Sequence, residues 1–161
     1  MKKRSKKKQG RGQPELRGEK TSPRLRPLPG MRDLLPSEVE ARGEVVELAR
    51  KVFAEWGYRR IITPTVESYE SLSPGMSPRY LDRSFKFFDR QGKLLLLRSD
   101  VTLPIARLVA ARLVNAPKPI KLCYTSSVYR EQPKEAGREQ EFYQMGIECI
   151  GTVGAEIDAE I

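Results

Sequence analysis

The chain has 161 residues, of which 39% are hydrophobic and 32% are charged, and it carries a formal net charge of +9 at pH 7. This length suits one domain with its own core and is short for two. Histidine is absent, which excludes a catalytic triad with a histidine base and a zinc site with imidazole ligands. No segment is apolar over the length that a membrane-spanning helix needs, and we expect a cytoplasmic protein.

The positive charge is concentrated at the start of the chain. Residues 1–26 contain eleven lysines and arginines but only two acidic residues, Glu15 and Glu19, which leaves 19 basic and 19 acidic side chains in the rest. This segment has no apolar periodicity, so we expect a disordered basic tail, followed by one domain over residues 27–161. Two interpretations of the tail are open: it contacts nucleic acid weakly through phosphates, or it is a solubilising extension. The neutral charge of residues 27–161 favours the second.

A long helix is predicted after a proline-rich entry segment. Ser37 followed by Glu40 predicts a capping box at its start, and Gly57 is a suitable residue to end it. Between them, apolar residues recur at the spacing of one helix face: Val39, Val45, Val46, Leu48, Ala49, Val52, Phe53 and Trp56. Residues 58–63 then predict a strand, which Pro64 ends.

The rest of the chain predicts further strands joined by short connections. Residues 68–80 are rich in serine, proline and glycine and predict a loop. The other predicted elements are a hairpin (85–88 and 93–98), a helix capped by Thr102 with Pro104 in its first turn, two strands (120–130 and 141–151) and a helical turn (154–161). This order favours an α+β fold, with a mainly antiparallel sheet and helices on one side. Because the chain ends as a new element begins, we expect a fragment.

The sequence gives no pattern for catalysis or metal binding. Cys123 and Cys149 fall in predicted strands without metal-type spacing, so we expect two buried free thiols in a reducing cytoplasm. The glycine in residues 73–78, SPGMSP, matches neither the dinucleotide-binding pattern nor the P-loop pattern. We therefore expect no catalytic residues, no metal and no cofactor.

Four polar residues are candidates for a binding site. Asp100 and Thr102 lie at a predicted strand-to-helix junction, where a carboxylate and a hydroxyl can hold an ammonium group, but both are also common helix-start residues. Arg130 ends a predicted strand and offers a planar set of donors that suits phosphate. Pairing of Arg130 with nearby glutamates on a wet surface is the other interpretation, and from the residues alone it is favoured. Gln144 is a polar residue in an alternating strand.

Three segments, taken in order, resemble the class II aminoacyl-tRNA synthetases in their histidyl form. Residues 128–148, VYREQPKEAGREQEFYQMGIE, resemble motif 2 of that superfamily, and residues 57–67, GYRRIITPTVE, resemble motif 1. Residues 27–38, PLPGMRDLLPSE, are similar to its entry segment. The resemblance covers about residues 27–161. It implies the N-terminal portion of a class II synthetase-like catalytic-domain fold, with motif 1 near a dimer interface and the later elements, motif 3 among them, missing.

Within this superfamily the sequence resembles the regulatory subunits of ATP phosphoribosyltransferase. The synthetases carry Pro-Glu-Gly-Thr where residues 99–102 read SDVT, whereas the regulatory subunits carry Asp-x-Thr-x-Pro-x-Ala-Arg, as residues 100–107 do here. The resemblance implies a non-catalytic subunit that is required for the first step of histidine biosynthesis and mediates feedback regulation by histidine. The alternative is a fragment of a histidyl-tRNA synthetase, which activates histidine with ATP and transfers it to tRNA.

The resemblance also implies roles for the four polar residues. Asp100, Thr102 and Gln144 would bind histidine, and Arg130 would be the remnant of a phosphate or nucleotide contact. The implied partners are the catalytic phosphoribosyltransferase subunit, a second copy of the chain through the motif 1-like region, and histidine as effector. Glu131 directly follows Arg130, and Pro133 comes earlier than in the synthetases, which argues against their way of positioning ATP.

Overall fold

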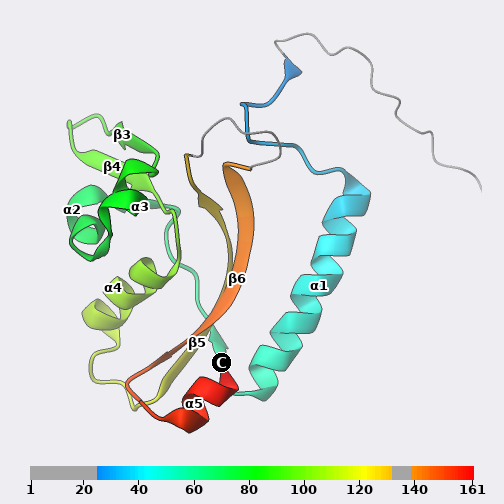
Figure 1. The fold of residues 1–161 in the computed structure, drawn as a ribbon, viewed down its shortest axis with the longest axis vertical. Helices are drawn as coiled ribbons and strands as arrows, with labels where there is room; N and C mark the ends of the chain where they lie inside the picture. The colour runs from blue at the N-terminus through cyan, green and yellow to red at the C-terminus, as the bar shows by residue number, and fades with distance from the viewer. Residues whose placement is uncertain (1–24, 132–138) are drawn as a thin grey trace, which may run out of the picture.

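The computed structural model describes residues 25–131 and 139–161, so the predicted tail up to residue 24 lies outside the described residues. Twelve elements follow one another in the described part (Figure 1). They are α1 Pro36–Glu55, β1 Arg59–Arg60, β2 Val66–Ser68, α2 Tyr69–Leu72, the 3-10 helix η2 Ser73–Gly75, α3 Pro78–Asp82, β3 Lys86–Phe88, β4 Leu94–Leu97, α4 Thr102–Arg112, β5 Ile120–Tyr129, β6 Glu141–Ile150 and α5 Ala155–Glu160. None of the described helices is both long and apolar enough to span a membrane.

The strands form two three-stranded sheets. In the first, of order β1-β5-β6, the long strands β5 and β6 run antiparallel from the pair Ile120–Ile150 to the pair Tyr129–Glu141, and β1 adds a short parallel edge. The second, of order β2-β4-β3, is antiparallel throughout. The predicted α+β fold with a mainly antiparallel sheet is confirmed, as are the hairpin and the two long strands.

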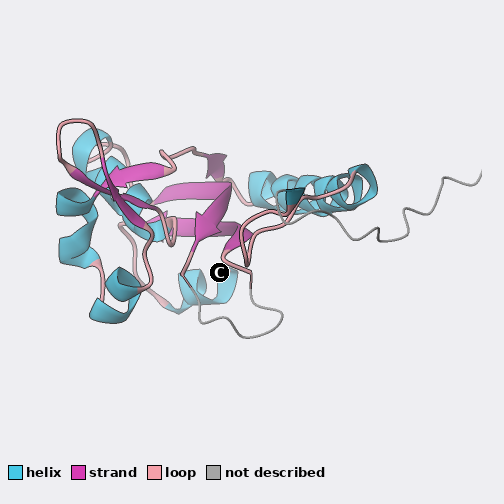
Figure 2. Cartoon of the chain, turned by 90° about the horizontal axis from the view of Figure 1, so that it is seen from above, coloured by secondary structure: helices cyan, strands magenta, loops and turns pink. Residues whose placement is uncertain are grey.

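Helices cover both faces of the β5–β6 pair, so the prediction that they lie on one side is wrong. Figures 1 and 2 show α4 on one side of these strands and α1 on the other. The guanidinium of Arg42 in α1 lies 4.9 Å from the ring centre of Tyr143 in β6, on the face that turns away from α4. The physical reason is that the face of β5 opposite α4 also has a buried position: Leu122 points to α4, whereas its neighbour Cys123, also buried, points to the opposite face.

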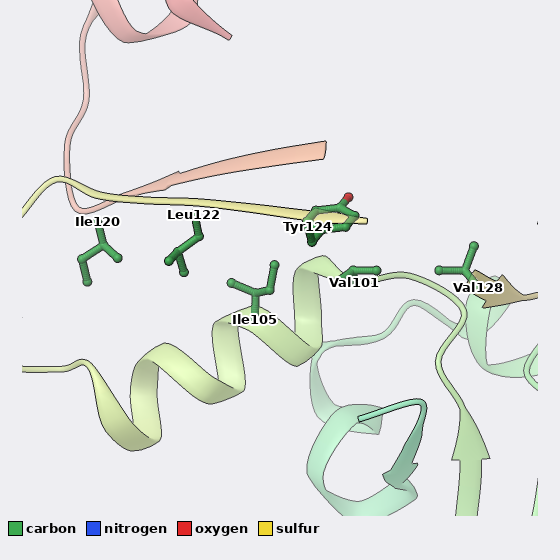
Figure 3. Close-up of a cluster of buried hydrophobic side chains, with 6 residues drawn as sticks. All are labelled: Val101, Ile105, Ile120, Leu122, Tyr124 and Val128. Carbon is green, nitrogen blue, oxygen red and sulfur yellow. The ribbon is translucent and has the colours of Figure 1, made fainter. Parts of the chain in front are cut away.

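The main core lies between α4 and β5 (Figure 3). Its six buried side chains come from the start of α4 and from alternate positions of β5: Val101, Ile105, Ile120, Leu122, Tyr124 and Val128. Because residues two apart on a strand share one face, this spacing turns a single apolar stripe of β5 toward α4. The core therefore fixes the first turn of α4 against the middle of the sheet.

Helix α1 begins two residues earlier than the sequence predicted, with Leu35 rather than Ser37 as its N-cap residue. The carboxylate of Glu38, not Glu40, accepts a hydrogen bond of 3.0 Å from the backbone N–H of Leu35, and Ser37 lies inside the helix. Pro36 occupies the first turn, where its fixed φ and missing N–H are tolerated. The predicted end is confirmed, because Gly57 follows the helix with a φ of 81°.

The predicted loop over residues 68–80 is wrong, since most of it is helical. Residues 66–68 form β2, and α2, η2 and α3 follow in short turns. Pro74 and Pro78, which suggested a loop, occupy the first turns of η2 and α3. The predicted strand over residues 58–63 shortens to β1 because the chain leaves the first sheet after Ile61 and enters the second at Val66.

Arg98 ties the two sheets together at this crossing. It is only 5% exposed, and its guanidinium donates to the carbonyl oxygens of Thr63 at 2.8 Å, Pro64 at 3.3 Å and Ser127 at 2.8 Å. Burial lowers the pKa of this guanidinium from its ordinary value. Three backbone carbonyls thus share one side chain as a hydrogen-bond donor.

The short helix α5 is fastened to the sheet by a carboxylate. Glu160 accepts hydrogen bonds from Lys121 Nζ at 2.7 and 2.9 Å and from the hydroxyl of Tyr58 at 2.7 Å. These hydrogen bonds, that from Lys121 first, hold the pKa of Glu160 below its ordinary value of 4.5. A group with a lowered folded-state pKa stabilises the fold above its unfolded-state pKa, and this contribution disappears as the pH falls through the folded-state value.

We therefore expect Glu160→Gln to destabilise the protein at pH 7 and to have little effect at pH values well below 4.5. The measurement is urea unfolding of both proteins across that range. Glu156→Gln, a change on the same helix, is the matched control. A destabilisation that stays constant down to the lowest pH would contradict the role of the ionised carboxylate.

Candidate functional site

The structure brings together three of the four predicted site residues at one end of the first sheet. Asp100 lies between β4 and α4, Arg130 directly follows β5, and Gln144 is on β6. Gln144 Nε2 lies 3.3 Å from Asp100 Oδ2, and Arg130 Nη2 lies 3.6 Å from the same oxygen. Two side chains that are far apart in the sequence, Arg130 and Gln144, therefore lie next to the carboxylate of Asp100.

Asp100, rather than Thr102, pairs with the backbone at the start of α4. Its Oδ1 accepts a hydrogen bond of 2.8 Å from the backbone N–H of Thr102, which is the first residue of the helix. The predicted capping role of Thr102 is therefore wrong, because the carboxylate two residues earlier has that function. The hydroxyl of Thr102 donates instead to Glu148 Oε1 at 2.7 Å. Thr102 is thus adjacent to Asp100 but is bound to a second carboxylate.

The amide nitrogen and the amide oxygen of the Gln144 side chain differ in their hydrogen bonding. Its Nε2 donates to the hydroxyl of Tyr124 at 3.0 Å and to Asp100. Its Oε1 is buried and has no hydrogen-bond partner in the part of the chain that the structure describes. A buried acceptor without a partner has a free-energy cost, which a ligand that donates a hydrogen bond would remove.

Arg130 is partly buried and is contacted on several sides. Its Nε donates to the carbonyl oxygen of Ser99 at 2.8 Å, and its guanidinium lies 5.0 Å from the ring centre of Phe142 and 5.5 Å from that of Tyr80. These contacts fix the direction of its planar donors. The loop that follows, with Pro133, Gly137 and Arg138 of the motif 2-like segment, lies outside the described residues.

Two further residues belong to the site but did not stand out in the sequence. Glu148 and Tyr124 lie on the same face of the sheet as Gln144, because the register pairs Ser126 with Gln144 and Tyr124 with Gly146, and Glu148 is two residues further on. Burial raises the pKa of the Tyr124 phenol, and the charges of Asp100 and Glu148 raise it further, whereas the hydrogen bond from Gln144 lowers it. The period-two spacing of residues 144, 146 and 148 was the signal that could have identified Glu148.

Gly146 leaves the space that Tyr124 occupies. A Cβ atom at this position would lie 2.7 Å from the Tyr124 hydroxyl and 2.9 Å from its Cζ. We expect Gly146→Ala to displace the ring, to break its hydrogen bond with Gln144, and to lower the free energy of unfolding by about 1–3 kcal/mol. Urea unfolding measures this change, and Gly43→Ala, where a Cβ meets no atom within 4 Å, is the control expected to be neutral or stabilising.

The arrangement suits a small ligand with an ammonium group. The carboxylates of Asp100 and Glu148, the free oxygen of Gln144 and the Tyr124 hydroxyl are all on the α4 side of the sheet. An ammonium group has three donors and no acceptor, so it can satisfy several of these oxygens at once. Arg130, next to Asp100, provides a positive charge for an anionic group of the same ligand.

Comparison with protein families and relatives places the chain among known proteins. A family model described as Histidyl-tRNA synthetase matches residues 30–161. An ATP phosphoribosyltransferase regulatory subunit of Desulforamulus reducens is 41% identical over 83% of this chain and 33% of its own length. One from Geobacter sulfurreducens is 42% identical over 84% of this chain and 31% of its own length. The chain thus spans about a third of the length of these curated relatives.

Solved structures agree with the sequence comparison. A Bacillus halodurans protein described as an ATP phosphoribosyltransferase regulatory subunit/histidyl-tRNA synthetase superposes with a TM-score of 0.75 at 38% identity, over 84% of this chain and 35% of the other. A histidine–tRNA ligase subunit of Alicyclobacillus acidocaldarius superposes with a TM-score of 0.71 at 28% identity, over 91% of this chain and 40% of the other. The described fold is therefore that of a histidyl-tRNA synthetase-like domain.

Proposed function

The chain belongs to the histidyl-tRNA synthetase family, whose model matches residues 30–161, and we propose that within it the chain is an ATP phosphoribosyltransferase regulatory subunit, a non-catalytic subunit required for ATP phosphoribosyltransferase activity. In this role it assembles in the cytoplasm with a catalytic subunit that joins ATP to phosphoribosyl pyrophosphate, the first step of histidine biosynthesis. It also mediates feedback regulation of that step by histidine. The observation that carries the proposal is the convergence of Gln144 and Arg130 on Asp100, in a chain whose curated relatives have this name.

The proposed effector site uses the charges of the cluster. The amino group of histidine binds between Asp100 and the free Oε1 of Gln144, next to Thr102, and Arg130 provides a positive charge for the carboxylate of the amino acid. Regulation then requires histidine to bind two states of the assembly with different affinity, a coupling of about 1–3 kcal/mol in typical cases. Arg130, as the remnant of a nucleotide contact, is available for this role because Ser99 and two aromatic rings fix its position.

The proposal is tested by reconstitution with a short-form catalytic subunit. We expect phosphoribosyltransferase activity to appear only when both chains are present, and histidine to suppress it. Activity that is the same with and without this chain would contradict the role as a required subunit. Activity that depends on the chain but does not respond to histidine would contradict only the effector site.

The alternative, part of a histidyl-tRNA synthetase, is also consistent with the family model and with the structure of a histidine–tRNA ligase subunit. It predicts histidine-dependent exchange of pyrophosphate into ATP. Adenylate formation requires the charge on the α-phosphate to be stabilised from several sides. We therefore expect no exchange by this chain, and exchange above background would decide for the synthetase.

The second proposed partner is another copy of the chain. Helix α1 has no buried residue, and several of its apolar side chains are more than 50% exposed, among them Val45, Leu48 and Trp56. Such a stripe on a 20-residue helix, directly before the motif 1-like segment at residues 57–67, supports a dimer through this part of the chain. Sedimentation equilibrium tests this: the chain sediments as a dimer, and Leu48→Lys as a monomer. A monomeric wild-type chain would contradict the proposal. Nucleic-acid binding by the basic tail rests on residues outside the described part.

A further inference from the structure

Asp100 also lines a pocket that is separate from Gln144 and Arg130. A pocket of about 420 Å³ is formed between the short helices α2, η2 and α3, strand β4, and the start of α4. Asp100 and Thr102 line it, but Gln144 and Arg130 do not. This volume falls in the range of about 300–1,000 Å³ that is usual for small-molecule sites. We refer to it as the α2–α4 pocket.

The α2–α4 pocket is lined largely by apolar side chains, which are packed between neighbouring elements. Leu72 and Leu96, which are 4% and 0% exposed, line it together with Leu103. Gly75 lets η2 approach α4 closely, since a Cβ there would lie 2.8 Å from Leu103 Cδ2. The apolar wall is therefore held by contacts between elements and does not depend on a mobile side chain.

Asp100 carries the single charge in the lining of the α2–α4 pocket, within the described residues. A carboxylate can accept about four hydrogen bonds, and Oδ1 of Asp100 receives only the one from the N–H of Thr102 among the described residues. A neutral apolar ligand would remove water from this carboxylate without replacing its hydrogen bonds, which costs free energy. A ligand with an ammonium group would replace them, and an anionic ligand would be repelled.

We propose that the α2–α4 pocket binds a small primary amine with a branched or aromatic hydrocarbon body. The ammonium group donates to Asp100, and the body packs on Leu72, Leu96 and Leu103. This site does not require the proposed function, because its apolar part is separate from Gln144 and Arg130. Since both ligands use Asp100, the amine and histidine compete, so the pocket gives the protein a means to respond to a second metabolite class.

The test uses 3-methylbutylamine as the probe and 3-methylbutan-1-ol as its neutral isostere. Titrations of the 161-residue chain are followed by NMR of leucine methyl groups and by calorimetry. We expect saturable binding of the amine, with shifts at Leu72, Leu96 and Leu103, and binding of the alcohol weaker by about tenfold or more. Absence of saturable amine binding, equal binding of the alcohol, or shifts confined to other methyl groups would each overturn the proposal.

Filling the pocket separates this site from the histidine site. Leu103→Trp is expected to abolish amine binding and to leave histidine binding unchanged, whereas Val153→Trp, at a position that is 97% exposed between β6 and α5, is the matched control that changes neither. If Leu103→Trp lowers the melting temperature strongly, Met76→Phe, at another residue of the lining, fills the pocket and gives the same reading. Amine binding that survives in a folded filled variant refutes the α2–α4 pocket. Loss of histidine binding alone bears on the proposed function.

Discussion

Replacing Arg98 with methionine is expected to lower the free energy of unfolding by about 3 kcal/mol. The substitution keeps a long apolar side chain but removes the donors to Thr63, Pro64 and Ser127. Burial of the guanidinium lowers its pKa, so the native side chain already carries a desolvation cost that the variant avoids. This gain is smaller than the cost of leaving three carbonyls without donors, at about 1–3 kcal/mol each.

Urea unfolding of Arg98→Met and of the control Arg90→Met measures this effect. Arg90 is exposed in the turn between β3 and β4, and we expect its replacement to change stability by no more than about 0.5 kcal/mol. Equal stability of the two variants would show that the two sheets do not depend on Arg98 for their connection. A loss of stability with an unchanged urea dependence would confirm that the fold remains two-state.

Replacing Asp100 with asparagine is expected to weaken histidine binding by about 10- to 100-fold. Asparagine retains an oxygen for the N–H of Thr102, so the start of α4 stays capped, but it removes the negative charge opposite the amino group. It also leaves Arg130 without its carboxylate neighbour at 3.6 Å. The effect therefore falls on binding rather than on folding.

Calorimetric titration of histidine into Asp100→Asn checks this, with Asp82→Asn as the control that removes one charge at the exposed end of α3. Only the Asp100 variant should lose affinity. Thermal melting of both variants verifies that they are folded. Equal affinity in the wild type and in folded Asp100→Asn would remove this carboxylate from the proposed site.

Long elements that are marked by a regular apolar spacing and bounded by turn residues were predicted best from the sequence. The long strands at 120–130 and 141–151 and the hairpin were predicted to within one or two residues, because apolar alternation and glycine turns act locally. The family resemblance was confirmed because its motifs occur in a fixed order. Prediction from the sequence failed where two nearby residues could each cap the same helix. Glu38 rather than Glu40 caps α1, and Asp100 rather than Thr102 accepts the first N–H of α4.

The site required the register of the sheet, which the sequence did not provide. Asp100, Arg130 and Gln144 were named as candidates, but their contacts depend on the pairing of Ser126 with Gln144 across β5 and β6. The same pairing places Glu148 beside Thr102. Cys123 is buried as predicted, whereas Cys149 is only partly covered, because it lies on the opposite face of an edge strand.

A crystal structure of the protein grown with L-histidine is the most direct test of the proposed effector site. The account predicts that the amino nitrogen lies about 3 Å from a carboxylate oxygen of Asp100 and from Gln144 Oε1, with the carboxylate of the ligand turned toward Arg130. Histidine bound at another place on the protein, with this cluster unchanged, would contradict it.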